Sequence, residues 1–315
     1  MRVSVAGGGL IGLSSALELA RRGASVTVCD DGRKGQASWA AAGILGPQSE
    51  VHEPSPMLQL CLASFRLYEE WARGLGDTGF RKNGTLHLAF SDAEAEALSA
   101  QREWQRAQGL RVLERAHPTA KLSLFFPDEG QVEPRKLLQA LRAACAQAGV
   151  QFAERTAEQP DLICTGSWSG APVFPVRGQM LALEVPPPPC VVFGAGGYLV
   201  PREGRTLVGA TAEQVGFDAG VTPQGREQLE QIARALGSAG PVLDHWAGLR
   251  PGTPDGLPLL GRLEGGPALC TGHHRNGVLL APITARIAAA LVLGEAPPLD
   301  LTPFHPRRKG IVSSS

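Results

Sequence analysis

The chain has 315 residues, of which 43% are hydrophobic, so it can bury a core large enough for about two domains without disulfides or a structural metal. Its thirty Lys and Arg side chains balance thirty Asp and Glu side chains. This balance excludes a general electrostatic attraction to nucleic acid or to an anionic membrane surface, so we expect function to reside in a local site.

The cysteines and the apolar stretches favour a cytoplasmic protein. Six cysteines are scattered with no C-x-x-C pair and no spacing typical of zinc, which predicts reduced thiols and no metal site. The N-terminal glycine pattern and Glu18 favour a strand and a helix over a signal peptide. Val278 to Leu293 contains Pro282 and Arg286 and is shorter than the roughly 20 residues of a bilayer span, so no span is expected. The sequence leaves open whether copies of the chain form a homo-oligomer.

The N-terminal segment predicts a strand, a helix and a second strand. Arg2 to Ala6 has the pattern of a short buried strand, and apolar residues then recur with helical spacing from Leu10 until Gly23. Ser25 to Asp30 has the pattern of the second strand. A parallel unit of this order needs a right-handed crossover and typically opens a doubly wound sheet.

Helices and strands follow one another through the middle of the chain. Two apolar stripes predict a helix that is covered on most sides, one made by Cys61, Phe65, Tyr68 and Ala72 and the other by Leu60, Leu67 and Trp71. The next expected elements are a strand at Gly84 to Phe90, helices at Asp92 to Gln108 and Pro134 to Ala148, and strands at Val150 to Ala153 and Asp161 to Thr165.

From Val176 the pattern changes to strands and turns without crossover helices, as at Tyr198 to Arg202 and Arg205 to Gly209, which favours an antiparallel second domain. A strand at Ala268 to Thr271 and a helix from about Pro282 to Leu293 return the chain to the first domain. The predicted fold class is α/β, with a Rossmann-type domain built on a doubly wound sheet from residues 1–75, 130–175 and 262–315. Residues 76–129 and 176–261 are expected to form a smaller, largely antiparallel α+β substrate domain.

A dinucleotide-binding fingerprint follows the first strand. Gly7, Gly9 and Gly12 form G-x-G-x-x-G, in which the glycines allow a tight turn, a close approach to a pyrophosphate and close helix packing. The phosphate then lies at the helix N-terminus. Asp30, at the end of the next strand, is placed to accept both hydroxyls of an adenosine ribose. The fingerprint predicts a bound dinucleotide but does not separate NAD from FAD.

Four further segments resemble the glycine oxidases of the D-amino acid oxidase superfamily. They are A-S-W-A-A-A-G at residues 37–43, C-T-G-S-W-S-G at 164–170, H-W-A-G-L-R-P-G-T-P-D-G at 245–256 and G-H-H-R-N-G at 272–277. Together with the fingerprint they span nearly the whole chain in the family's order. The resemblance implies FAD, and no residue obviously provides a covalent link to it.

By this resemblance, the first segment passes the flavin phosphates and ring, the Thr165-Gly166 turn supports the adenine end, and the last segment faces the isoalloxazine ring. Small side chains from Ser38 to Gly43 agree with this, as do backbone amides near a helix N-terminus that can stabilise negative charge on reduced flavin. The residues expected to bind the cofactor are Gly7, Gly9, Leu10, Ile11, Gly12, Asp30, Ser38, Ala41, Ala42, Gly43, Thr165, Gly166, Trp168, Arg275, Asn276, Gly277, Val278 and Leu279.

The same resemblance assigns the substrate carboxylate to Arg250 in W-A-G-L-R-P-G and to Tyr198 in Y-x-V-P-R. Arginine suits this role because its planar fork makes two parallel bonds to a carboxylate and stays charged. Arg275 is a second candidate for the same pocket. Ala212 stands where glycine oxidases can place a bulkier side chain near the substrate α-carbon, so we expect room for side chains larger than hydrogen.

Two further features bear on the resemblance. His273 and His274 are expected to be structural or to line a loop, because hydride transfer to flavin needs only an unprotonated amine and good alignment. Glu154 to Asp161 is too short to hold the strand pair that usually precedes the T-G turn in this family. Cofactor binding should survive this trimming, because the missing piece would lie at the periphery of the sheet.

These assignments predict an FAD-dependent oxidase that converts glycine or a small neutral D-amino acid to a 2-oxo acid and ammonia, with oxygen as acceptor and hydrogen peroxide as product. Glycine would link the enzyme to thiamine synthesis, and D-amino acids to catabolism. Alternatives of the same broad class are a sarcosine oxidase and an amino acid dehydrogenase. An alternative of another class is a non-catalytic flavin-bound subunit or redox sensor, against which the pair of Tyr198 and Arg250 argues.

Overall fold

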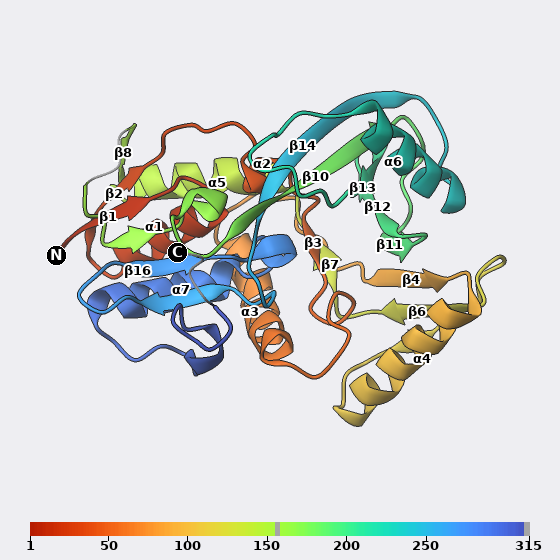
Figure 1. The fold of residues 1–315 in the computed structure, drawn as a ribbon, viewed down its shortest axis with the longest axis horizontal. Helices are drawn as coiled ribbons and strands as arrows, with labels where there is room; N and C mark the ends of the chain where they lie inside the picture. The colour runs from red at the N-terminus through yellow and green to blue at the C-terminus, as the bar shows by residue number, and fades with distance from the viewer. Residues whose placement is uncertain (155–157, 312–315) are drawn as a thin grey trace.

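The computed structural model describes residues 1–154 and 158–311. The long strands β10 (Phe174–Leu183) and β14 (Val242–Gly252) pair antiparallel and run from one part of the molecule to the other (Figure 1). The expected absence of a strand pair between Glu154 and Asp161 falls partly on residues 155–157, which lie outside the described residues.

The first part contains a six-stranded sheet in the order β15-β16-β9-β1-β2-β8. Its strands are β1 (Arg2–Ala6), β2 (Ser25–Cys29), β8 (Gln151–Ala153), β9 (Leu162–Ile163), β15 (Leu259–Arg262) and β16 (Ala268–Thr271). Neighbouring strands pair in parallel, except that β15 and β16 pair antiparallel with each other. The Rossmann-type sheet predicted from the sequence is confirmed. Since β15 belongs to it, we propose a domain boundary before residue 259, where the sequence patterns suggested 262.

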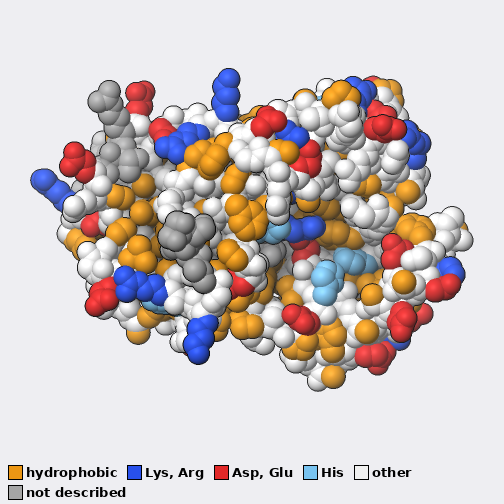
Figure 2. Space-filling model, viewed as in Figure 1, with side chains coloured by type: hydrophobic (Ala, Val, Ile, Leu, Met, Phe, Trp, Pro, Cys, Tyr) orange, Lys and Arg blue, Asp and Glu red, His pale blue; other side chains and the backbone are white. Residues whose placement is uncertain are grey.

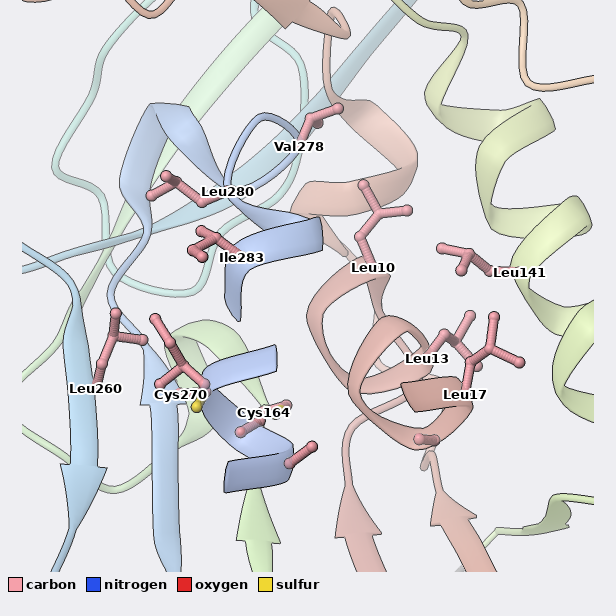
Figure 3. Close-up of a cluster of buried hydrophobic side chains, with 14 of the residues drawn as sticks. Leu10, Leu13, Leu17, Leu141, Cys164, Leu260, Cys270, Val278, Leu280 and Ile283 are labelled. Atoms are coloured by element: carbon pink, nitrogen blue, oxygen red, sulfur yellow. The ribbon is translucent and has the colours of Figure 1, made fainter. Parts of the chain in front are cut away.

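Four helices supply the core against this sheet: α1 (Leu10–Arg21), α3 (Pro56–Arg73), α5 (Pro134–Gln147) and α7 (Ala281–Leu293). Leu13 and Leu17 of α1 point toward Leu141 of α5, and Ile283 of α7 lies near Leu260 of β15 (Figure 3). Helix α7 is apolar on nearly every side because it is buried between its neighbours. On α3 the first predicted stripe is mostly buried, whereas Leu67 and Trp71 of the second are half-buried.

The second part is an eight-stranded sheet in the order β14-β10-β13-β12-β11-β4-β6-β5. Its further strands are β4 (Thr85–Ala89), β5 (Leu113–Glu114), β6 (Leu122–Phe126), β11 (Val191–Gly194), β12 (Gly197–Arg202) and β13 (Arg205–Gly209). Pairing is antiparallel except between β4 and β11, as the sequence pattern predicts for this domain. Helix α4 (Asp92–Ala107) packs on β4 and β6. The remaining short elements are α2 (Ala37–Ala40), β3 (Ile44–Leu45) and β7 (Gly130–Gln131).

The expectation of no crossover helix after Val176 is wrong. Helix α6 (Pro223–Ala235) connects β13 to β14, which flank β10 and run parallel to each other. Its start carries the usual signals, because the Thr222 side chain accepts a hydrogen bond from the Gly225 N–H and proline occupies the first turn. Few of its side chains are apolar, so its periodicity is weak in the sequence.

Alternation along the strands of the second sheet creates two different faces. Leu181, Leu199 and Val208 point toward α6, whereas Met180 and Tyr198 belong to a separate cluster on the opposite face. This period of two follows from strand geometry. It turns Tyr198 toward the first domain, where the functional cleft lies.

Glu129 is a buried carboxylate below the 46–51 loop. It accepts hydrogen bonds from the N–H groups of Gln48 (2.6 Å) and Ser49 (2.8 Å) and from the hydroxyl of Thr85. Burial raises the pKa of Glu129 to about 7, because desolvation outweighs these hydrogen bonds. The folded pKa exceeds the unfolded one, so this group's stabilising contribution is fully present below the unfolded pKa and is lost as the pH rises to about 7.

We therefore expect the free energy of unfolding of wild type to fall by on the order of 3 kcal/mol between about pH 4.5 and 7. Glu129→Gln should lack this fall, because glutamine does not titrate. Urea unfolding of both proteins at about pH 5 and pH 7.5 measures this difference. The exposed Glu96 gives a matched control, Glu96→Gln. An identical pH dependence in wild type and Glu129→Gln would contradict the assignment.

Candidate active site

A long cleft lies between the carboxyl edge of the first sheet and the inner face of the second. It encloses about 1380 Å³, including open water at its mouth. The lining starts at residues 7–11 and Asp30, passes the 36–44 and 164–168 segments, and reaches Tyr198, Arg250 and the loop at 273–278. The carboxyl edge of a parallel sheet is where doubly wound folds bind their ligands.

The residues expected to bind the cofactor line this cleft, with the exception of Gly12, Asn276 and Leu279. A side chain at Gly12 would clash with the Gly7 carbonyl, so Gly12 lets α1 pack against the glycine turn. Asn276 donates its N–H to the His273 carbonyl and thus shapes the loop. Leu279 is buried in the core. These three residues support the lining rather than form it.

The fingerprint end of the cleft fits a dinucleotide. The N-cap residue of α1 is Gly9, which has no side chain, and the N–H of Leu10 donates to Ser38 Oγ at 3.0 Å. A Cβ at Gly8 would collide with the Asp30 carboxylate, so glycine allows Asp30 to sit beside the turn. Thr165 Oγ1 is buried and has no hydrogen-bond partner within residues 1–154 and 158–311. A helix N-terminus, a carboxylate and a vacant hydroxyl suit the phosphates and the adenosine of FAD.

The W-A-G part of the W-A-G-L-R-P-G segment shapes the 37–43 loop. Trp246 Nε1 donates to the Ala40 carbonyl at 3.0 Å, and a Cβ on Gly248 would lie 2.5 Å from the Ala40 Cβ. Both residues lie on β14, so this strand positions the small-residue segment along the cleft. The W-A-G-L-R-P-G motif was recognised in the sequence, but a role was predicted there only for its arginine.

Arg202 fixes the other side of the same loop and was not anticipated from the sequence. Its guanidinium is buried and donates to the carbonyls of Ala42 (2.5 Å) and Val132 (2.8 Å) and to Gln131 Oε1 (2.6 Å). Burial lowers the pKa of Arg202 to about 10. The guanidinium thereby ties β12 to the part of the cleft where small side chains allow a planar ring to approach.

Arg250 and Tyr198, the two residues assigned to the carboxylate, both face the cleft. Arg250 Nη1 donates to the Thr211 carbonyl at 3.0 Å, and in the described part of the chain no carboxylate lies within ion-pair distance of it. The guanidinium lies across Gly178, where any Cβ would collide with it. Burial raises the pKa of Tyr198 against the opposing effect of Arg250, so the phenol is neutral and can donate a hydrogen bond.

Arg275, the second candidate, is already paired. Its Nε lies 3.2 Å from Glu50 Oε2, and this carboxylate raises the pKa of Arg275 further. Glu50 lines the cleft and escaped the sequence reasoning, because it belongs to no motif. The pairing leaves Arg250 as the better partner for an external carboxylate.

The two histidines of the loop are neutral. His273 is buried with its Nε2 3.1 Å from Thr284 Oγ1, and burial lowers its pKa to about 3, in agreement with the structural role expected for it. Burial, together with Arg250 and Arg275, lowers the pKa of His274 to about 4. Neither imidazole adds positive charge to the cleft near neutral pH.

Ala212 lies outside the main cleft, on the wall of a second chamber. The two cavities share Tyr198, Arg250, His274 and Arg275, so the chamber adjoins the end of the cleft that these residues line. Figure 2 shows the molecule hollowed near the middle of one face, with basic and histidine side chains gathered there.

Residues 1–154 and 158–311 contain no group of three or more His, Cys, Asp or Glu side chains that could hold a metal ion. None of their helices is both long enough and apolar enough to cross a bilayer.

Comparison with known proteins agrees with this geometry. A model of the family described as "FAD dependent oxidoreductase" matches residues 2–160 and 162–291. The glycine oxidase of Pseudomonas putida is 31% identical over 97% of this chain and 98% of its own length. The crystal structure of glycine oxidase from Geobacillus kaustophilus superposes with a TM-score of 0.90 at 31% identity, covering 98% of this chain and 99% of that one.

The chain belongs to the FAD-dependent oxidoreductase family. Within it, the chain is similar along its length to proteins named glycine oxidase. It is also 38% identical to the bifunctional protein ThiO/ThiG of Synechocystis sp. over 97% of its own length. It spans about half of that relative, 54% of its length.

Arg202→Lys should weaken FAD binding by about 10- to 100-fold, because a compact ammonium with three donors cannot span the four oxygens that the guanidinium contacts, and each lost bond costs about 1 kcal/mol. Fluorescence titration of the apoprotein with FAD measures this loss. Arg205→Lys, an exposed change in the next strand, serves as control. Unchanged affinity in a folded Arg202→Lys protein would show that the loop needs no such tie.

Proposed function

We propose that this enzyme oxidatively deaminates glycine and small neutral D-amino acids to a 2-oxo acid, ammonia and hydrogen peroxide. The observation that carries the proposal is the guanidinium of Arg250, which is free of carboxylate partners among the described residues and lines the same cleft as the Tyr198 phenol. A small anionic substrate can bind both. Similarity to proteins named glycine oxidase supports this choice of substrate.

Each residue then has a defined role. FAD, held by the glycine turn and the 36–44 segment, would supply a hydride acceptor for the substrate α-carbon. Arg250 and Tyr198 hold the carboxylate, which fixes the α-carbon in one pose. Glu50 holds Arg275 aside, so the two arginines do not compete for the same group. The imine product is released to water and hydrolyses.

A covalently flavinylated sarcosine oxidase would need an accessible, reactive cysteine at the cleft. The two cysteines of the lining, Cys164 and Cys270, are both buried, and burial raises the pKa of Cys164 well above its usual value and keeps it a thiol. We therefore propose non-covalent FAD and, with all six cysteines free and buried, a cytoplasmic location. Oxygen as acceptor and a link to thiamine synthesis are proposals that rest on the similar proteins.

Arg250→Ala should lower kcat/KM for glycine by some hundreds to thousands of fold, because a two-pronged charged hydrogen bond contributes on the order of 3 to 5 kcal/mol. Arg250→Lys should recover only part of the loss, since it keeps the charge and loses the fork. Peroxide release at matched FAD occupancy measures both variants. Near-normal turnover by Arg250→Ala would place the carboxylate elsewhere, with Arg275 the next residue to test.

Ala212→Met should lower kcat/KM for D-alanine relative to glycine. The longer side chain would project into the second chamber, whose wall includes the exposed Ala212. A substrate side chain gains about 0.8 kcal/mol for each methylene that it buries, and D-alanine would lose this gain if methionine filled the space. The ratio of the two kcat/KM values in variant and wild type is the measurement, and an unchanged ratio would show that residue 212 does not border the substrate.

A further inference from the structure

Residues 211–222, which we call the strap, connect β13 to α6 and are fixed at both ends by a buried side chain of β10. That side chain is Gln179. Its Nε2 donates to Glu213 Oε1 at 2.7 Å and to Thr222 Oγ1 at 3.0 Å, and its Oε1 accepts the Thr222 N–H at 2.8 Å. The two ends of the strap are therefore tied to the second sheet.

Arg177, also on β10, fixes the tip of the strap, which comprises residues 215–219. Its buried guanidinium donates to Glu213 Oε2 and to Asp218 Oδ2, each at 2.6 Å. The backbones of Arg177 and Glu213 exchange two further hydrogen bonds. Charge-assisted hydrogen bonds are stronger than neutral ones, so the bond to Asp218 holds the tip in one position.

The tip contacts the first part of the molecule at the segment that follows Asp30. A Cβ at Gly35 would lie 2.7 Å from the Ala219 Cβ, so glycine at this position lets the strap come close. Asp30, earlier in the same segment, lies beside the glycine turn at Gly8. The tip is thus near the end of the cleft that suits the phosphates and the adenosine of FAD.

Phe217 makes an aromatic contact at this end. Its ring packs on that of Trp168, with 5.5 Å between the centroids, and the guanidinium of Arg33 lies 5.8 Å from the same Trp168 ring. Trp168 and Arg33 line the cleft, and Phe217 lies behind them, outside the lining. Because the Phe217 side chain is 55% exposed, its removal should change the core little.

We propose that the strap closes the adenosine end of the FAD site, with Phe217 as a positioning residue that holds the Trp168 ring beside the cofactor. FAD gains from this contact without touching Phe217, because a ring that is already fixed loses less freedom when the cofactor binds. The inference concerns retention of FAD and is independent of the substrate proposed above.

The test compares FAD with ADP, which carries the adenosine and the phosphates without the flavin. Fluorescence titration of the apoprotein gives the FAD affinity, competition with FAD gives the ADP affinity, and dilution of the holoenzyme gives the rate of FAD release. Phe217→Ala should weaken FAD and ADP by the same factor, about 3- to 10-fold, which is the contribution of an aromatic pair. Arg202→Lys, at the small-residue loop, should weaken FAD and leave ADP as in wild type.

Three further variants make the test specific to the contact. Phe217→Tyr keeps the ring and should bind both ligands as wild type does. Asp218→Asn weakens the bond to Arg177 and should raise both dissociation constants, as Phe217→Ala does. Leu243, on β14, is 51% exposed and lines neither cavity, so Leu243→Ala should leave both affinities unchanged.

Three outcomes would overturn the proposal. The first is wild-type affinity for FAD and ADP in Phe217→Ala. The second is a loss of FAD affinity alone, which would place the effect of Phe217 at the flavin end. The third is a change of oligomeric state in size-exclusion chromatography with both affinities unchanged, which would make the strap a contact between copies of the chain. Urea unfolding of each variant shows whether a loss of affinity comes from a loss of stability, and a matching fall in stability would also refute the role of Phe217.

Discussion

The register of β10 against β14 is the constraint on which the site depends. It places Gly178 opposite Gly248 and Met180 opposite Trp246, with Arg250 two residues further along the same strand. Strand alternation then puts Trp246, Gly248 and Arg250 on one face. A slip of one residue would turn all three away from the cleft. One strand pair thus positions the 37–43 loop, through Ala40, and the Arg250 guanidinium together.

Gly178 of β10 and Gly248 of β14 lie opposite each other and leave room for the side chains of Ala40 and Arg250. Ala40 fills the space above Gly248, and the guanidinium of Arg250 lies flat across Gly178. The arginine is therefore oriented by excluded volume and by one backbone carbonyl rather than by a carboxylate. An arginine held in this way keeps its charge-assisted hydrogen bonds for a ligand, because no acid in residues 1–154 and 158–311 pairs with it.

The sequence was sufficient for features that short segments determine. The residue types at Gly7, Gly12 and Asp30 could be predicted, because a tight turn, a helix packed on it and the end of the next strand impose them locally. The contacts of Arg202 and Glu50 could not, because they join residues far apart in the chain, such as Arg202 with Ala42 and Glu50 with Arg275. Arginine and glutamate in such places resemble surface residues until the fold brings their partners together.

The distribution of charge at the cleft follows from these long-range contacts. Arg275 is balanced by Glu50, and Arg177 is balanced by Glu213 and Asp218. His273 and His274 are held neutral by burial, and His274 also by the two nearby arginines. Among the described residues, Arg250 is the arginine lining the cleft that has no carboxylate partner, and the α1 N-terminus adds a partial positive charge at the far end, beside the Asp30 carboxylate. An anionic group at Arg250 and phosphates at the α1 N-terminus would each meet positive charge, an arrangement that suits FAD together with a carboxylate.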